Sequence, residues 1–566
     1  MNAGGLCAAR DSVEVGLMAE SYVCGVSDAP LIYQTIGGAL DAAAERFAER
    51  PALIVRHQNI RLSYAGFSAA VDDFAAGLLA LGLSRGDRIG IWSPNNAEWV
   101  IAQFATARLG LILVNINPAY RTAELEYVLN KVGARALILA KSFKTSDYVG
   151  MVRSLGAEKL PHLEEAIVIA NEPIEGFKLF KAVSALATDD LRARVREIGA
   201  GLSPDDPINI QFTSGTTGFP KGATLTHHNI VNNGRFVAAR QQFTEEDRLC
   251  IPVPLYHCFG MVMGVLGCVT HGAAMVFPDE AFDPESVLDA VERERCTALY
   301  GVPTMFIAEL DHPTFKGRDL SSLRTGVMAG APCPEPIMRR VISDMHMKDV
   351  TICYGMTETS PVSFQSMPDD DLEKRVTTVG SIHPYVEVKI IDVDGKTVER
   401  GVQGELLTRG YSVMRGYWGD PGKTEEAIDE GGWMRTGDLA VMDEDGYCRI
   451  TGRVKDMIIR GGENVYPREI EEFLYRHPAV QDVQVFGVPD EKYGEEVCAW
   501  IRLRVGEAVV EEEIRAFCKG QIAHYKIPRY VRFVDDFPMT VTGKVQKFVM
   551  RDAMAAEISP PKQRVS

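Results

Sequence analysis

Predicted helices and strands alternate along this chain from about residue 65, and this alternation constrains the fold more than any other feature. Helical spacing of apolar residues and short apolar runs follow one another in 74–83 (helix), 88–92 (strand), 98–110 (helix), 111–116 (strand) and 131–140 (strand), and 296–304 continue the pattern. Alternation of this kind implies βαβ units and a mostly parallel sheet. We therefore expect the α/β fold class.

The last ~110 residues form a separate unit of ordinary domain size. There the sequence predicts a helix at 469–480, strands at 480–490 and 495–505, and a helix from 510 that stops at Pro528. The length of 566 residues also exceeds what one hydrophobic core supports. We expect a large N-terminal domain of α/β subdomains, residues 1–452, and a small α+β domain, residues 453–566.

Charge and cysteine content exclude several classes of protein. The net charge of −17 argues against a general binder of nucleic acid or of membrane surfaces, because both would repel it. Eleven cysteines without a C-x-x-C pair are typical of a reduced compartment. The first thirty residues lack an apolar run of signal-peptide length, and no later run is long enough to span a membrane. We expect a soluble cytoplasmic protein without stable membrane insertion.

The stretch TSGTTGFPKG at 213–222 combines glycines, hydroxyls and a lysine after a predicted strand. Its register does not fit the Walker A phosphate loop, because Lys221 comes three residues after the second glycine. Backbone N–H groups, hydroxyls and the lysine can still hold phosphate oxygens. A solvent-exposed hairpin loop is the alternative that this stretch alone leaves open. The candidate phosphate ligands are Thr213, Ser214, Gly215, Thr216, Thr217, Gly218 and Lys221.

Two further motifs carry groups that suit a nucleotide. YGMTE at 354–358 supplies a ring that can stack on a base, a hydroxyl for phosphate and a carboxylate for magnesium. WMRTGDLA at 433–440 supplies Asp438, and an acidic residue suits the paired hydroxyls of a ribose. Taken alone, the first motif is weak and the second fits an ordinary turn.

Seven motifs in a fixed order decide between a nucleotide site and ordinary loops and turns. They are TSGTTGFPKG, AGAPCP (329–334), YGMTE, GELLTRGYSVMRGYW (404–418), WMRTGDLA, TGRVKDMI (451–458) and PMTVTGKVQK (538–547). With them the chain resembles the adenylate-forming superfamily from about residue 35 to 550. It is most similar to the medium-chain fatty acyl-CoA synthetases, through PLYHCFG, LYGVPTMF and KDMIIRGGENVYPREIEEF.

The resemblance implies a two-step reaction with ATP, Mg²⁺ and coenzyme A. A carboxylate attacks the α-phosphorus of ATP, which gives an acyl-adenylate and pyrophosphate, and the coenzyme A thiol then releases AMP. By position, Tyr354 stacks on adenine, Thr357 contacts phosphate and Glu358 binds magnesium. The remaining nucleotide contacts that the resemblance implies are the backbone of Gly330 and Ala331 at the adenine, and Asp438 and Arg453 at the ribose.

The resemblance also assigns residues to the small domain. Lys544 would bridge the substrate carboxylate and the α-phosphate, which suits a step that brings two anions together. The small domain of the family rotates between the half-reactions, with Lys455 at the hinge position. After rotation, Gly461 and Gly462 would line the pantetheine tunnel.

The acyl pocket would draw on 256–264, 301–306 and 326–330, with His257, Gly264 and Val302 among its walls. These segments are apolar and lack the aspartate that binds the ammonium of an amino acid. We expect a medium-chain fatty acid, with branched, terpenoid-derived and aryl acids open. Met261 and Met263 are flexible fillers, so they do not define chain length. His257 beside Cys258 lacks a hydrolase signature, so we expect a pocket-wall or gate residue there. His227 and His228 lack metal-ligand spacing, so we expect structural or surface residues.

Two other functions remain as alternatives, and the chain's oligomeric state, with a homodimer one option, is open. An acyl-AMP ligase that loads a carrier protein usually has an insertion before the hinge, and none is found between Asp438 and Lys455. A non-catalytic nucleotide-binding paralogue should lack Lys544 or Glu358, and both are present.

Overall fold

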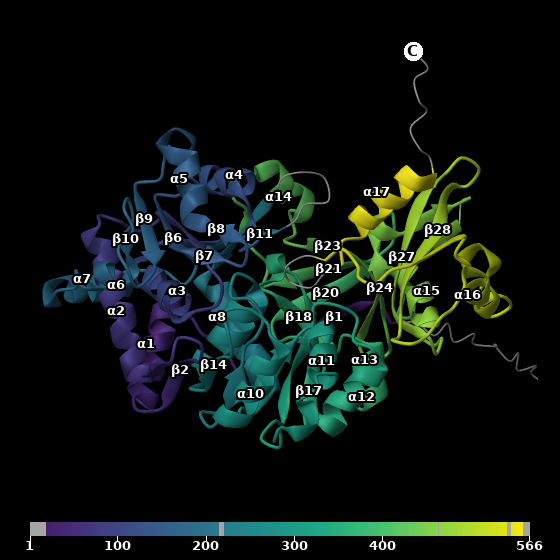
Figure 1. The fold of residues 1–566 in the computed structure, drawn as a ribbon, viewed down its shortest axis with the longest axis horizontal. Coiled ribbons are helices and arrows are strands. Elements are labelled where there is room, and N and C mark those ends of the chain that lie inside the picture. The colour runs from purple at the N-terminus through teal and green to yellow at the C-terminus, as the bar shows by residue number, and fades with distance from the viewer. Residues whose placement is uncertain (1–18, 214–219, 462, 540–544, 559–566) are drawn as a thin grey trace, which may run out of the picture.

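The computed structural model describes residues 19–213, 220–461, 463–539 and 545–558, and Figure 1 shows their arrangement. Two large sheets share one set of helices in the N-terminal part of the chain. A third sheet lies between them and the small C-terminal domain in this view. None of the helices in the described ranges has the length and apolar character needed to cross a membrane.

The first sheet is parallel except at one edge. Its strands, in spatial order, are β10 (Lys178–Leu179), β9 (Glu165–Ile169), β6 (Ala136–Ala140), β4 (Arg88–Trp92), β5 (Ile112–Asn115), β11 (Pro207–Thr213), β12 (Lys221–Thr226) and β22 (Gly416–Tyr417). The hairpin β11–β12 and the pair β12–β22 are antiparallel. This antiparallel edge brings residues of the 213–222 stretch beside residues almost 200 positions later.

The second sheet is parallel in its centre and antiparallel at its ends. Its order is β19 (Ser381–Ile382), β18 (Val362–Gln365), β17 (Asp349–Gly355), β16 (Thr325–Ala329), β15 (Ala298–Gly301), β13 (Arg248–Cys250), β14 (Ala274–Phe277), β2 (Pro51–Val55) and β3 (Ile60–Ser63). The central strands are buried throughout, as expected for a parallel sheet covered on both faces.

Helices pack against both faces of these two sheets. Between the sheets lie α1 (Ile36–Phe47), α2 (Tyr64–Ala80), α3 (Ala97–Leu109), α8 (His227–Arg240), the π-helix η1 (Phe259–Leu266) and α9 (Gly267–His271). Outside the first sheet pack α4 (Thr122–Val132) and α5 (Tyr148–Lys159), and outside the second pack α10 (Pro284–Glu294), α11 (Pro303–Leu310) and α12 (Glu335–Asp344). Further helices are α6 (Phe180–Ser184), α7 (Asp189–Ala200), α13 (Leu372–Thr377) and α14 (Pro421–Ala427).

Local sequence accounts for the ends of the central helices. The Asn96 side chain accepts a hydrogen bond from the Trp99 amide at the start of α3, and Gly110 ends that helix with a φ of 67°. At the start of α8, Thr226 and Asn229 form a reciprocal capping box. These caps fix where each helix begins relative to the strand before it.

The third sheet is antiparallel and contains β1 (Tyr22–Cys24), β20 (Val386–Ile391), β21 (Gly404–Gly410), β23 (Met434–Met442) and β24 (Cys448–Arg453). Its last strand leads through the short 3₁₀ helix η4 (Val454–Asp456) into the small domain. Asp438 and Arg453 are register partners on β23 and β24. The third sheet therefore connects the nucleotide motifs to the expected hinge.

The small domain has a sheet of β26 (Glu463–Val465), β25 (Ile458–Arg460), β28 (Gly494–Leu503), β27 (Val480–Asp490) and β29 (Tyr530–Phe533). Its helices are α15 (Pro467–Leu474), α16 (Glu511–Cys518) and α17 (Lys547–Ile558). The helix expected over 510–528 ends ten residues early, at Cys518. Gly520 has a φ of 74° there, and Lys519 pairs with Ile522, so the chain turns before Pro528.

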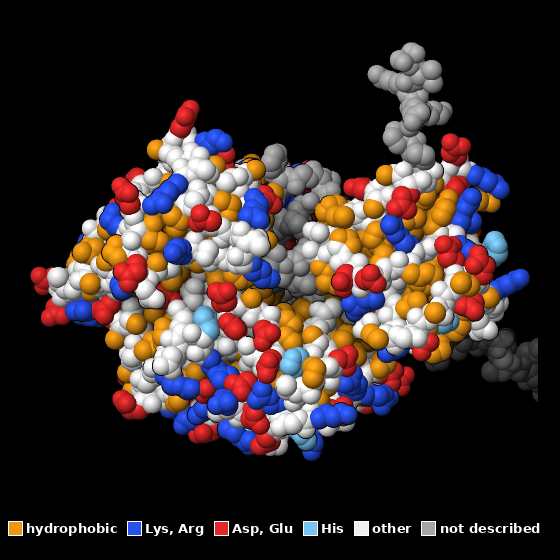
Figure 2. Space-filling model, in the orientation of Figure 1, with side chains coloured by type: hydrophobic (Ala, Val, Ile, Leu, Met, Phe, Trp, Pro, Cys, Tyr) orange, Lys and Arg blue, Asp and Glu red, His pale blue; other side chains and the backbone are white. Residues whose placement is uncertain are grey.

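Acidic and basic side chains are interspersed over the face shown in Figure 2. The net charge of −17 is thus not gathered into one stretch on this face. A phosphate-binding site in such a chain has to be built locally, from a few residues in defined positions.

Candidate active site

The ends of the hairpin β11–β12 flank the predicted phosphate-binding stretch. Thr213 is the last residue of β11, Lys221 is the first of β12, and the two are register partners. The predicted ligands Ser214, Gly215, Thr216, Thr217 and Gly218 lie outside the described residues. The hairpin nevertheless fixes Thr213 and Lys221 at the base of this stretch.

Thr213 and Lys221 are joined to Glu358 through one tyrosine. Glu358 Oε1 accepts hydrogen bonds from Thr213 Oγ1 at 3.2 Å and from the Tyr417 phenol at 2.9 Å. The same phenol accepts a 3.0 Å hydrogen bond from Lys221 Nζ. The structure therefore brings together three predicted residues from two motifs, with Tyr417 at their centre.

In this group Glu358 and Tyr417 are buried and Thr213 and Lys221 are half-buried, and burial shifts the pKa values of Lys221 and Tyr417. Burial is the main reason that the pKa of Lys221 is lowered; the Glu358 carboxylate opposes the shift and the nearby Lys455 adds to it. Burial and the Glu358 carboxylate raise the pKa of Tyr417. At neutral pH the phenol therefore stays protonated and donates a hydrogen bond to the carboxylate.

The chemistry of Glu358 fits a magnesium ligand. Its side chain is buried, and among the described residues it accepts only from neutral hydroxyls and forms no ion pair. A buried carboxylate without a cation is costly, and a divalent ion would offset that cost. No group of three or more His, Cys, Asp or Glu side chains in the described residues could hold a metal by itself. Mg²⁺ usually binds one or two carboxylates and completes its shell with water and substrate phosphates.

A second cluster forms where β17 of the second sheet meets β23 of the third. The Tyr354 phenol donates a 2.6 Å hydrogen bond to Asp438 Oδ2, and Arg453 Nε donates to Asp438 Oδ1 at 3.1 Å. Burial, followed by the charge of Asp438, raises the pKa of Tyr354 well above its ordinary value. The three residues predicted at the adenosine are thus in contact.

Gly330 lies beside the predicted acyl pocket. It follows β16 with a φ of 89°, and a Cβ there would lie 3.3 Å from Val302 Cγ1. Ala331 is next and exposed, whereas Thr357 is buried in the 3₁₀ helix η3 (Thr357–Thr359). Gly330 of the predicted adenine segment therefore lies near Val302 of the predicted acyl segment.

The segment predicted to line the acyl pocket is the π-helix η1, a form often found at functional sites. His257 precedes it, and its Nδ1 accepts a 3.2 Å hydrogen bond from the Phe259 amide. Gly264 is buried inside η1, where a Cβ would lie 3.1 Å from Ile251 Cδ1. A larger residue at Gly264 would press on this core side chain.

Met261 is held more firmly than its flexibility led us to expect. Its sulfur accepts hydrogen bonds from Asn115 Nδ2 and Gln211 Nε2, both at 3.1 Å. Its carbonyl accepts from Gln103 Nε2 at 3.2 Å, and Cys258 Sγ lies 3.2 Å from Gln211 Oε1. A buried amide cluster therefore anchors η1 to the ends of β5 and β11.

His227 and His228 have structural surroundings, as expected. His227 is fully buried, and its Nδ1 accepts a 3.1 Å hydrogen bond from the Ile36 amide. Burial lowers the pKa of His227 to about 4. His228 packs against Tyr33 with ring centroids 5.7 Å apart. His227 thus connects α8 to the first residue of α1, and His228 connects α8 to the segment just before α1.

Lys455 lies exposed in η4, directly after Arg453 and Val454. Gly461 has a φ of 60°, and its amide donates a 2.8 Å hydrogen bond to the Tyr493 carbonyl within the small domain. Gly461 is thus separate from the two clusters described above. Gly462 and Lys544 lie outside the described residues.

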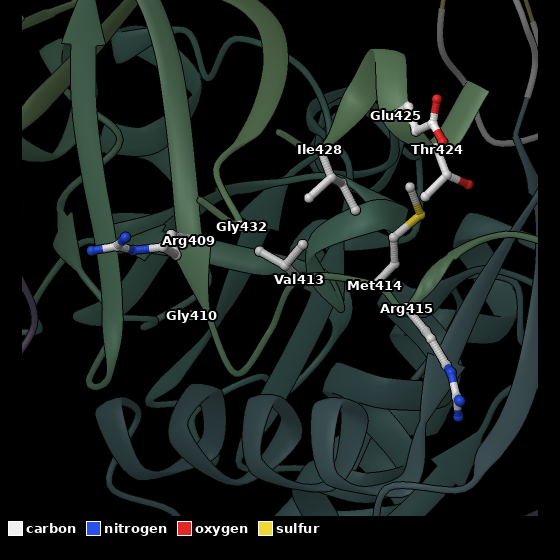
Figure 3. A pocket seen from close by; sticks show the side chains of 9 residues that line it. All are labelled: Arg409, Gly410, Val413, Met414, Arg415, Thr424, Glu425, Ile428 and Gly432. Carbon is white, nitrogen blue, oxygen red and sulfur yellow. The ribbon is translucent and has the colours of Figure 1, made fainter. Parts of the chain in front are cut away.

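A cleft of about 420 Å³ is lined by residues that precede and follow Tyr417 in the sequence. Figure 3 shows Val413, Met414, Thr424 and Ile428 grouped around it, with the Arg409 and Arg415 side chains directed away to either side. The Met414 amide donates a 2.8 Å hydrogen bond to the Glu358 carbonyl. The cleft wall therefore supports the backbone of the magnesium-ligand candidate.

Comparison with known proteins divides the chain as the fold does, into a large N-terminal part and a small C-terminal part. Residues 40–418 match the family described as AMP-binding enzyme, and residues 469–544 match the AMP-binding enzyme C-terminal domain. The chain belongs to the AMP-binding enzyme family. This AMP-binding enzyme is 51% identical over 537 residues to the Bacillus subtilis (strain 168) protein YngI, covering 93% of this chain and 98% of that protein.

Other relatives extend the comparison. The mouse medium-chain acyl-CoA ligase ACSF2, mitochondrial, is 48% identical over 552 residues, covering 94% of this chain and 90% of the relative. The crystal structure of the anthranilate CoA ligase AuaEII in complex with anthranoyl-AMP superposes with a TM-score of 0.84 at 29% identity, covering 94% of this chain and 99% of that one. These likenesses confirm the predicted family and its α/β architecture.

Two groups in this AMP-binding enzyme were not predicted from the sequence. Tyr417 stands inside the GELLTRGYSVMRGYW motif, and an aromatic hydroxyl in a nucleotide motif was a signal that could have singled it out. In the amide cluster that anchors η1, Asn209 joins Asn115 and Gln211 through hydrogen bonds. These polar residues stand within otherwise apolar strands. Polar residues in a buried strand need partners, which is a usable signal.

Proposed function

We propose that this protein is an AMP-forming acid–thiol ligase that converts a medium-chain fatty acid to its coenzyme A thioester. The full-length likeness to a medium-chain acyl-CoA ligase carries the proposal. The two contacting clusters add support, because one suits an adenosine and the other suits phosphates with magnesium. ATP, coenzyme A and a small carboxylic acid are therefore the substrates.

In the first half-reaction a carboxylate oxygen attacks the α-phosphorus of ATP, and the bond to the β-phosphate breaks to release pyrophosphate. Tyr354, Asp438 and Arg453 would hold the adenosine, with the backbone of Gly330 and Ala331 at the base edge. Thr213, Lys221 and Thr357 would bind phosphate oxygens, together with the hydroxyls and amides of 214–218. Lys544 would hold the carboxylate and the α-phosphate together as charge moves between them.

Magnesium would be held by Glu358 and by the ATP phosphates. When bound, it would neutralise charge on the triphosphate. The residues of this chain would orient the tail: Thr213 and Lys221 from the hairpin on one side, and Glu358 from η3 on the other.

In the second half-reaction the thiol sulfur attacks the acyl carbon, the bond to AMP breaks, and the thiol proton leaves to solvent. We propose that the small domain, beginning at residue 453, rotates about Lys455 between the two steps. Support comes from the exposed position of Lys455 in η4, since hinges lie where large φ/ψ changes meet little resistance. Gly461 and Gly462 would then approach the acyl-adenylate.

The acid would lie against η1 and α11, with His257, Gly264 and Val302 among the wall residues. Support comes from the position of Val302, whose Cγ1 would lie 3.3 Å from a Cβ added at Gly330, so that an apolar side chain stands close to the expected adenylate. A medium-chain fatty acid is preferred because the lining is apolar and because ACSF2 is named for that class.

The experiment is an acid panel with ATP, Mg²⁺ and coenzyme A. Straight-chain acids of increasing length are compared with branched, terpenoid and aryl acids, and pyrophosphate, AMP and thioester are measured. The expected result is equal formation of all three products, greatest with medium-chain acids. Formation of ADP and orthophosphate would refute the adenylation chemistry, and a preference for an aryl acid would refute the substrate class.

We also propose a cytoplasmic location and, as an option to be tested by light scattering, a homodimer. The ten cysteines in the described ranges are free thiols, which suits a reducing compartment. Fractionation of the source cells tests the location.

A further inference from the structure

Tyr417 is held in place from its own backbone outward. It lies on β22, the edge strand that pairs with β12, and its register partner is Ala223, two residues after Lys221. Its amide donates a 2.9 Å hydrogen bond to Thr424 Oγ1 on α14. The preceding Gly416 has a φ of 143°, and a Cβ there would lie 2.8 Å from Thr424 Cγ2. Thr424 also borders the cleft in Figure 3, so the residue of α14 that holds the Tyr417 amide is itself part of the cleft wall.

The hydrogen bonds of the phenol have only one allowed direction. An ammonium group only donates and an ionised carboxylate only accepts, so the phenol accepts from Lys221 and donates to Glu358. Lys221 Nζ also lies 4.1 Å from the centroid of the Tyr417 ring, which adds a cation–π contact. The tyrosine is 7% exposed, so water does not compete readily for these contacts.

The same arrangement keeps two opposite charges apart. Lys221 and Glu358 attract each other, and a direct ion pair between them would occupy both groups. The phenol stands between them instead, because each group bonds to the same oxygen of Tyr417. Glu358 Oε1 is then saturated by Thr213 and Tyr417, while in the described residues Oε2 carries no hydrogen bond. One carboxylate oxygen thus remains for another ligand.

We propose that Tyr417 is a positioning residue that separates Lys221 from Glu358 and presents Glu358 Oε2 to the magnesium ion of Mg²⁺–ATP. The proposal rests on the proposed phosphate and magnesium roles of Lys221 and Glu358. Without the phenol, Lys221 and Glu358 pair directly, and the site loses its preference for the magnesium-bound triphosphate.

Tyr417→Phe tests this inference, because it keeps the ring beside Lys221 and removes only the oxygen. Binding of ATP and of AMP is measured by displacement of a fluorescent nucleotide, with and without Mg²⁺. AMP lacks the β- and γ-phosphates, so it reports the adenosine cluster alone. The expected result is a loss of about tenfold to a hundredfold in Mg²⁺–ATP affinity, with AMP affinity unchanged, as for a lost hydrogen bond to charged groups.

Tyr64→Phe is the matched control. Tyr64 is also buried, and its phenol donates a 2.7 Å hydrogen bond to the Ala273 carbonyl, far from both clusters in the sequence. It should leave the ratio of Mg²⁺–ATP to AMP affinity unchanged. Tyr417→Leu removes ring and hydroxyl together, and should weaken Mg²⁺–ATP binding more than Tyr417→Phe.

Three outcomes decide the matter. Wild-type affinity of Tyr417→Phe for Mg²⁺–ATP would overturn the inference. Equal weakening of AMP and Mg²⁺–ATP would also overturn it, because Tyr417 would then only support the fold. Glu358→Gln is measured in parallel, and if it leaves the magnesium dependence intact, the proposed magnesium site itself is wrong and the Tyr417 inference fails with it.

Discussion

Tyr354 donates a 2.6 Å hydrogen bond to Asp438 across the junction of two sheets, 84 residues apart in sequence. Tyr354 is the last residue but one of β17 in the second sheet, and Asp438 lies within β23 of the third. Arg453 Nε reaches the other oxygen of the same carboxylate. The adenosine candidates are therefore in direct contact with one another, and both oxygens of Asp438 still have lone pairs to offer a ribose.

Asp438→Ala should raise the KM for ATP about tenfold to a hundredfold, because it removes the acceptor for the ribose hydroxyls and leaves the Tyr354 phenol without its partner. Steady-state pyrophosphate release measures this. Glu387→Ala is a matched control: Glu387 also accepts from a tyrosine, Tyr22, and from an arginine, Arg409, but at the surface of β20. An equal rise in KM for both variants would contradict the ribose assignment.

Lys544→Ala should lower adenylation by at least about a hundredfold, because the other cation of the motif, Lys547, is already paired with Glu471 at 2.6 Å. Thioester formation from supplied acyl-adenylate should remain, since the proposed mechanism uses Lys544 in only one half-reaction. Pyrophosphate release measures the first step, and consumption of preformed adenylate by coenzyme A measures the second. Lys519→Ala controls for the loss of an exposed lysine in the same domain, and equal loss of both steps in Lys544→Ala would contradict the assignment.

The sequence was sufficient for the architecture because its signals there are local. The helix–strand alternation predicted β4, α3 and β5, and the strand expected at 480–490 coincides with β27. The prediction of a helix up to Pro528 is wrong after Cys518. The chain turns at Gly520, although the apolar residues beyond it keep a helical spacing. The π-helix η1 was missed since its backbone is set by packing and by the amide cluster beneath it.

The candidate site was predictable as a set of residues but not as a set of contacts. Thr213, Lys221 and Glu358 were identified by motif, and Tyr354, Asp438 and Arg453 likewise. Which residue joins them depends on the pairing of β12 with β22, which brings Lys221 to Tyr417 across 196 positions. No local periodicity specifies such a pairing, so the contacts of Tyr417 with Lys221 and Glu358 emerged only from the structure, although its place in a nucleotide motif could have marked the residue.

Lys455→Pro should separate the two half-reactions in the opposite sense to Lys544→Ala. Proline fixes φ near −65° and restricts the preceding Val454, so the rotation of the small domain would be hindered. Adenylation should largely survive while thioester formation falls about a hundredfold or more, with acyl-adenylate retained on the enzyme. Lys455→Ala removes the charge without the backbone restraint and should retain the second step. Equal slowing of both steps in the proline variant would mean that the hinge is elsewhere.

Glu309 should make the protein less stable as the pH rises. Its side chain on α11 is 1% exposed, one of its oxygens has no hydrogen-bond partner, and burial raises its pKa well above the ordinary value. Below the unfolded-state pKa of about 4.5 the carboxyl is neutral in both states. As the pH rises from there towards the raised folded value, the unfolded chain releases the proton while the folded chain keeps it, so the free energy of unfolding falls.

Glu309→Met should therefore stabilise the protein at pH 8 by about 1–3 kcal/mol, the usual cost of an unsatisfied buried polar group. The gain should shrink as the pH falls towards the unfolded-state pKa of about 4.5, because a growing fraction of the unfolded chains then also carries the neutral carboxyl. Urea unfolding of both proteins from pH 5 to 9 measures the difference. Glu373→Met, at an exposed position of α13, should show a difference that does not change over this range. A gain for Glu309→Met that is independent of pH would mean that the carboxyl is ionised, and hence partnered, in the folded protein.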